Sequence, residues 1–112
     1  MSNLEFVNHS CVIISHDNVS IAMDPWIEGS VFNNSWDLLS KTNQKSIETL
    51  KKSNFVWFSH EHPDHFNPPN LKIFTDKNNF LFQKTIDGRV TNFLKKISPH
   101  VNEINFKDKF RL

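Results

Sequence analysis

The stretch that decides how this chain folds and functions reads Ser59-His60-Glu61-His62-Pro63-Asp64-His65. An apolar run rich in aromatic and β-branched residues, positions 54–59, leads into it and predicts a buried strand. Pro63 fits neither a central strand nor a helix interior, so the chain has to turn soon after that strand. We therefore expect the polar side chains of this stretch to gather on a bend at the end of a buried strand.

Four side chains on the expected bend are of the types that bind transition metals, namely His60, His62, Asp64 and His65. His60 and His62 are two positions apart and should share one side, while Asp64 and His65 should face a neighbouring point. Imidazole and carboxylate donors suit Zn²⁺, Fe²⁺ or Mn²⁺, whereas Mg²⁺ and Ca²⁺ call for oxygen ligands. The pattern predicts a site for one or two metal ions. A solvated polar loop or an adventitious His-rich tract is the alternative, but neither needs the buried strand or the proline.

The order His60-x-His62-x-Asp64-His65 resembles the His-x-His-x-Asp-His signature of the metallo-β-lactamase superfamily. The resemblance implies an α+β fold, the αββα sandwich, and one or two metals that activate a water for hydrolysis of an ester, lactone or phosphodiester. It assigns His60 and His62 to the first metal and Asp64 and His65 to the second, with Asp64 also catalytic because it would orient or deprotonate the water. Zinc is the expected metal, iron or manganese the alternatives, and the substrate-binding residues are unknown.

A second resemblance starts at Asp24-Pro25-Trp26 and continues to Leu39. Together with the signature, this segment resembles the catalytic region of the CMP-N-acetylneuraminate hydroxylases, and the opening residues 8–14 are similar to the lactonase-like and phosphodiesterase-like branch. The resemblance implies that Asp24 orients a ligand imidazole through its other nitrogen, although an Asp before a proline also forms turns and caps. The hydroxylases carry a Rieske iron–sulfur domain, for which this chain, with one Cys, lacks ligands.

Three functions follow in order of preference: a metal-dependent hydrolase, a monooxygenase of the hydroxylase type, and a non-catalytic remnant or partner-binding domain. The family takes further His and Asp ligands from a downstream half that builds the second sheet. We therefore expect residues 1–112 to form the amino-terminal part of one truncated domain, inactive by itself. Half a sandwich leaves an apolar face uncovered, so we also expect a homodimer or docking of the missing carboxy-terminal half.

Hydrophobic patterning gives the remaining elements. It predicts a meander of strands over residues 4–7, 11–15 and 19–23, then strands over 79–84, 101–106 and 109–112. Helices are expected over 46–52, with Ser46 as N-cap, and over 89–97, with a short helix or turn over 70–75. Residues 27–45 should form a long loop with a helical turn near Trp36, held to the core by its aromatic side chains.

Composition narrows the partners and the compartment. The chain has 112 residues, 13 basic and 12 acidic, with a net charge of +1, so no overall field favours nucleic acid or a membrane surface. We expect a small-molecule substrate and a cytoplasmic location, since no signal-peptide pattern or membrane-spanning apolar run is present. Cys11 has no disulfide partner and should be a buried core residue. His9 could approach the site from the opening turn, but a lone histidine near a turn is more often simply exposed, and His16 and His100 carry no assignment.

Overall fold

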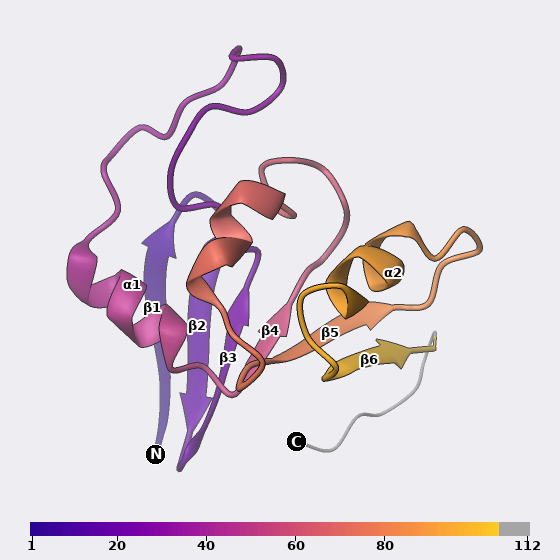
Figure 1. The fold of residues 1–112 in the computed structure, drawn as a ribbon. Helices are drawn as coiled ribbons and strands as arrows, with labels where there is room; N and C mark the ends of the chain where they lie inside the picture. Colours follow the sequence, from indigo (N-terminus) through magenta and orange to yellow (C-terminus); the bar gives the residue numbers. More distant parts are fainter. Residues whose placement is uncertain (106–112) are drawn as a thin grey trace.

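Six strands form one sheet in which the spatial order equals the sequence order (Figure 1). The computed structural model describes residues 1–105. The strands are β1 (Ser2–Asn8), β2 (Cys11–His16), β3 (Val19–Met23), β4 (Phe55–Trp57), β5 (Asn79–Gln83) and β6 (Val101–Ile104). The expected strand over 101–106 is therefore shorter, and the one expected over 109–112 lies outside the described residues.

The strand pairing changes from antiparallel to parallel at β3. β1, β2 and β3 are antiparallel neighbours joined by short turns, which confirms the predicted meander. From β3 onward every neighbour is parallel, and a parallel pair needs a long crossover connection. Those crossovers carry α1 (Gln44–Lys51), the 3-10 helix η1 (Pro68–Ile73) and α2 (Arg89–Lys95). The carboxyl ends of β4, β5 and β6 consequently meet at one edge.

Two local predictions are wrong, for backbone reasons. Helix α1 begins two residues before Ser46, because the extended Asn43 accepts a hydrogen bond from the Lys45 N–H at 2.8 Å and caps it. Ser46 instead donates to Glu5 on β1 at 2.8 Å. No helical turn forms near Trp36: residues 32–35 make a turn closed by a Val31–Trp36 bridge, with φ of 55° and 64° at its two asparagines. Asparagine tolerates this left-handed conformation better than most residues.

The core lies between one face of the sheet and the helices. Apolar side chains from β2 to β5 pack there against residues of the three helices, and the fully or nearly buried members include Ile13, Ala22, Val56, Phe80, Leu50, Leu71 and Leu94. Cys11 belongs to the same cluster, as expected. Burial, with smaller contributions from Asp24 and Glu5, raises the pKa of its thiol to about 12, so this cysteine is no nucleophile at neutral pH.

The opposite face is apolar at β1 and β2 but lacks a cover within residues 1–105. Leu4 is 68% exposed, Phe6 65% and Ile14 38%, and Leu4 pairs directly with Ile14 across the two strands. Large apolar side chains side by side on a sheet face are typical of an interaction surface. Among the described residues, no helix is long and apolar enough to cross a membrane.

Candidate metal centre

The signature lies immediately beyond the carboxyl end of β4. The paired residues of β4 end at Trp57, opposite Met23 of β3, although the Phe58 N–H still donates to the Leu81 carbonyl of β5 at 3.4 Å, so the predicted strand over 54–59 is shortened at both ends. The chain then bends, and the His62 carbonyl accepts from the N–H groups of His65 and Phe66 at 2.9 and 2.8 Å. This tight turn brings His65 close to His60.

The three imidazoles of the signature are close neighbours. The ring centroids of His60 and His62 are 4.7 Å apart, and those of His60 and His65 are 4.0 Å apart. His62 is exposed, while His60 and His65 are half-buried. The two residues predicted to lie on a common side therefore do lie together, although their role as ligands of a first metal stays a prediction.

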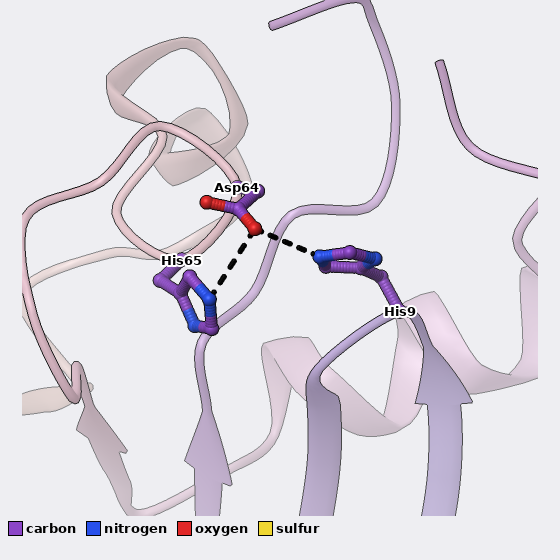
Figure 2. A group of neighbouring side chains, drawn as sticks. All are labelled: His9, Asp64 and His65. Carbon is purple, nitrogen blue, oxygen red and sulfur yellow. Dashed lines mark hydrogen bonds and ion pairs between the residues drawn. The ribbon is translucent and has the colours of Figure 1, made fainter. Parts of the chain in front are cut away.

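A histidine from the opening turn joins Asp64 and His65 (Figure 2). The Nε2 atom of His9 lies 2.9 Å from Oδ2 of Asp64, and Nε2 of His65 lies 3.3 Å from the same oxygen. One donor atom from each of these three residues falls within 4.8 Å of the others. His9 is exposed, as expected, yet its ring faces the site, because the left-handed backbone at φ 52° turns it from the end of β1 toward the signature.

The arrangement of lone pairs at Asp64 and His65 fits a cation. Nδ1 of His65 donates to Oδ2 of Asp24 at 3.0 Å, so in the neutral ring, the form that binds metal, Nε2 presents a lone pair. That lone pair faces a carboxylate oxygen of Asp64 at 3.3 Å. A ring nitrogen and a carboxylate oxygen face each other favourably when a positive charge, either a proton or a metal ion, lies between them, and imidazole with carboxylate suits Zn²⁺, Fe²⁺ or Mn²⁺.

The environment also keeps Asp64 ionised, as a ligand must be. Burial acts to raise the pKa of Asp64, but the hydrogen bond with His9 and the charges of His65 and His9 together bring it below its ordinary value. The side chain is nevertheless mostly withdrawn from solvent, at 10% exposure. A buried carboxylate held in its charged form beside two imidazoles is a good donor for a divalent metal.

Asp24 supports the site from β3. It is buried, follows Met23 directly, and has a left-handed φ of 47°, an uncommon conformation for a residue other than glycine. Its carboxylate accepts three hydrogen bonds, from the N–H and the O–H of Ser59, each at 2.7 Å, and from Nδ1 of His65. This is the kind of contact that the resemblance implies for Asp24, with Ser59 as an additional partner.

The remaining histidines lie elsewhere. His16 ends β2 at the edge of the sheet away from the signature, where its Nδ1 is 2.6 Å from the Ser2 hydroxyl. His100 is exposed and precedes β6, at the amino ends of the parallel strands. Neither side chain belongs to the donor group at the carboxyl ends.

The segment between β3 and α1, residues 27–43, projects beyond the same end of the sheet as the signature (Figure 1). Its base is fixed by polar side chains. Asn70 of η1, which is 4% exposed, accepts from the N–H groups of Ile27 and Glu28 at 2.6 and 2.9 Å and donates to the Glu28 carbonyl at 3.0 Å. At the other end, Asn8 donates to the Thr42 hydroxyl at 2.9 Å, and Thr42 donates to the Ile27 carbonyl at 2.5 Å.

The tip of this segment stays outside the core, contrary to prediction. Trp36 is 50% exposed and Leu39 fully exposed, so these side chains do not hold the loop down. Phe32 packs edge-on against Trp36 at 4.9 Å, and these rings lie 6.4 Å from His62 and 6.5 Å from His9, respectively. The aromatic pair thus borders the donor group.

Two cavities adjoin the centre. One, of about 710 Å³, is bounded by the end of β1, Trp26 and residues 35–41, and His9 forms part of its wall. The other, of about 570 Å³, lies between the signature and residues 82–90, with His60 and Glu61 in its wall. Both volumes are in the range of small-molecule sites. The first is lined largely by apolar side chains, among them Phe6, Val7, Trp36 and Leu38.

Comparison with known proteins identifies the family of this chain and its relatives. The model of the beta-lactamase superfamily domain matches residues 3–107. The cytidine monophosphate-N-acetylneuraminic acid hydroxylase of Asterias rubens is 28% identical over 75 residues, which are 67% of this chain and 12% of that protein.

Solved structures share the fold. A possible metal-dependent hydrolase from Veillonella parvula superposes with a TM-score of 0.74 and 13% identity over 100% of this chain and 45% of its own. CmlA, a diiron β-hydroxylase from Streptomyces venezuelae, gives 0.63 and 17% over 98% of this chain and 22% of its own. The chain thus spans about an eighth of the curated relative and less than half of either structure. The expected α+β fold of the metallo-β-lactamase type is borne out, and the described residues supply one sheet with its helices.

Proposed function

Because this chain belongs to the metallo-β-lactamase superfamily, we propose that it provides metal-binding and catalytic residues of a metal-dependent hydrolase for an ester, lactone or phosphodiester. The observation that carries the proposal is the donor group in which Nε2 of His65, at 3.3 Å, and Nε2 of His9, at 2.9 Å, approach the same carboxylate oxygen of Asp64. The convergence of two imidazoles on one carboxylate oxygen is typical of a site for a divalent metal.

In this proposal His60 and His62 hold one metal, and Asp64 and His65 hold a second with His9 as a further donor nearby. A bound divalent metal supplies a water nucleophile at neutral pH and polarises the bond to be cleaved. Asp64 would orient that water and accept its proton, and its lowered pKa keeps the carboxylate ionised. Asp24 keeps the His65 ring in the orientation that directs Nε2 toward Asp64.

The cavity beside His9 supports a small-molecule substrate with an apolar portion. Its wall combines aromatic and aliphatic side chains with one residue of the donor group, so a ligand in it would place its reacting end near Asp64. The second cavity, beside His60, is bounded by polar and charged residues, including Glu61, Lys84 and Asp87, and suits a polar ligand group.

Metal content and turnover test the proposal. The purified chain should retain zinc, iron or manganese after dialysis, and a His60→Ala, His62→Ala double variant should lose most of it, whereas His16→Ala should not. Equal metal in the double variant and the wild type would contradict the assignment. Hydrolysis of 4-nitrophenyl esters, lactones and bis(4-nitrophenyl) phosphate by the 112-residue chain should be slow, since the first metal has only His60 and His62 assigned to it, fewer than the three ligands that a catalytic zinc usually has. A typical enzyme rate abolished by His62→Ala would show that the site is already complete.

The second candidate is a hydroxylase. Its support is the sequence similarity to hydroxylases and the fold shared with CmlA, which is named a diiron β-hydroxylase. A preparation that retains iron in preference to zinc, and that consumes O₂ with an electron donor such as a Rieske protein, would favour this function over hydrolysis. A chain that binds no metal at all would instead favour the non-catalytic remnant.

A further inference from the structure

Ser59 lies at the junction of β3, β4 and the signature. Its hydroxyl oxygen is 2.7 Å from Oδ2 of Asp24, 2.8 Å from Nδ1 of His60 and 3.4 Å from Nδ1 of His65. The backbone N–H of the same residue donates to the other oxygen of Asp24 at 2.7 Å. One small side chain therefore contacts the supporting carboxylate and two of the predicted metal ligands.

Counting protons fixes the direction of each hydrogen bond. An ionised carboxylate only accepts, so the single hydroxyl hydrogen of Ser59 points to Asp24, and 2.7 Å is a usual length for such a charge-assisted bond. With that hydrogen used, the Ser59 oxygen can only accept from His60, whose Nδ1 must then carry the proton. If the Ser59 hydroxyl instead donated to His60, its oxygen would lie 2.7 Å from Oδ2 of Asp24 with no hydrogen between them.

From this network we infer that Ser59 is a positioning residue, through which Asp24 sets the ring tautomer of His60 as well as that of His65. Asp24 acts on His65 directly, at 3.0 Å, and on His60 through the Ser59 hydroxyl. Both imidazoles then carry the proton on Nδ1 and present Nε2 as the free electron pair. A single buried carboxylate thereby prepares one ligand of each proposed metal.

The scaffold holds this carboxylate firmly. The Asp24 N–H donates to the Trp57 carbonyl at 3.0 Å, which links the residue after β3 to the last residue of β4. The Ser59 N–H bond fixes the other carboxylate oxygen, so the relative position of Asp24 and Ser59 does not depend on the hydroxyl. Removal of the hydroxyl should consequently change the His60 tautomer without displacing Asp24 or His65.

The inference rests on the proposed metal site but can be tested without metal. Two-bond ¹H–¹⁵N correlation spectra of ¹⁵N-histidine protein, metal-free and at a pH where the imidazoles are neutral, report which nitrogen carries the proton. We expect the Nδ1–H form for both His60 and His65 in the wild type. In Ser59→Ala, His60 should move toward the tautomer mixture of a free imidazole, while His65 keeps Nδ1–H. Ser59→Thr, which retains the hydroxyl, should restore His60.

Metal affinity supplies the second readout. Loss of a group that orients a metal ligand typically lowers affinity 10- to 100-fold, so Ser59→Ala should bind zinc about that much more weakly and Ser59→Thr within a few-fold of wild type. His65 is the internal control, since general unfolding would alter both histidines. A His60 tautomer that is identical in wild type and Ser59→Ala would overturn the inference, whatever the metal affinity. The expected tautomers in a protein that binds no metal would instead refute the proposed function and leave the inference standing.

Discussion

Replacing Asn70 with Ala tests what holds the loop of residues 27–43 at the centre. The substitution removes the bonds from Asn70 to Ile27, Glu28 and Asn67, four in all. Ile27 is 3% exposed, so its N–H is left buried without a partner, at a cost of about 1–3 kcal/mol. Glu28 is exposed and can turn to water, so each bond lost there costs nearer to 0.5–1 kcal/mol. We expect Asn70→Ala to lower the free energy of unfolding by about 3 kcal/mol.

Urea unfolding followed by far-UV circular dichroism measures this loss, and Asn92→Ala is the matched control. Asn92 is an exposed residue of α2, and its replacement should change stability by no more than about 0.5 kcal/mol. The tryptophan fluorescence of folded Asn70→Ala should also change, because Trp36 is carried by the loop and packs on Phe32. A loss below about 1 kcal/mol would refute the reasoning, since the loop would then be held by its other contacts.

Three further predictions concern other parts of the molecule. Cys11 should be inert to thiol reagents in the folded protein. The free energy of unfolding should fall by about 1.4 kcal/mol per pH unit above about pH 9, because the pKa of the thiol is near 9.0 in the unfolded chain but about 12 in the folded one. This fall should vanish in Cys11→Ala. The chain should self-associate through its exposed sheet face, so sedimentation should show a shift toward monomer in a Leu4→Ser, Phe6→Ser variant. The control Ile86→Ser, which replaces an apolar side chain fully exposed elsewhere, should show no such shift. A wild-type chain that is a stable monomer would count against the half-sandwich expectation. Asp24→Asn should release both His60 and His65 from the Nδ1–H form and weaken zinc binding more than Ser59→Ala does, and an unchanged His65 tautomer would contradict the role given to Asp24.

The sequence predicted the parts of the centre that depend on neighbours along the chain. The signature occupies consecutive positions after an apolar run, so its bend and the proximity of His60 to His62 follow from local geometry. The contact of His9 with Asp64 spans 55 residues and depends on the pairing of β1, β2, β3 and β4 in one register. A lone histidine in a turn carries no spacing signal, so only the resemblance to a family hinted at the importance of this segment.

The errors in the secondary structure have similar causes. Asn43 and Ser46 are both good N-caps, and the choice between them is made by the extended backbone at Asn43 and by Glu5, a residue on a distant strand. The apolar run through Phe58 continues past the end of its strand, because the pairing of β4 with β3 ends at Trp57 and Met23 while Phe58 keeps a bond to the Leu81 carbonyl of β5. Patterns within a segment cannot show where its neighbour stops.

The distribution of the donors along the chain has a consequence for how a metal would act on folding. Four of them, His60, His62, Asp64 and His65, occupy six consecutive positions, so an ion can be captured by the unfolded chain. His9 and Asp24 approach these residues only when the sheet has formed. Since a ligand stabilises the folded state only to the extent that it binds that state more tightly than the unfolded one, the rise in melting temperature on metal addition would measure the contribution of those two distant residues rather than the strength of the site as a whole.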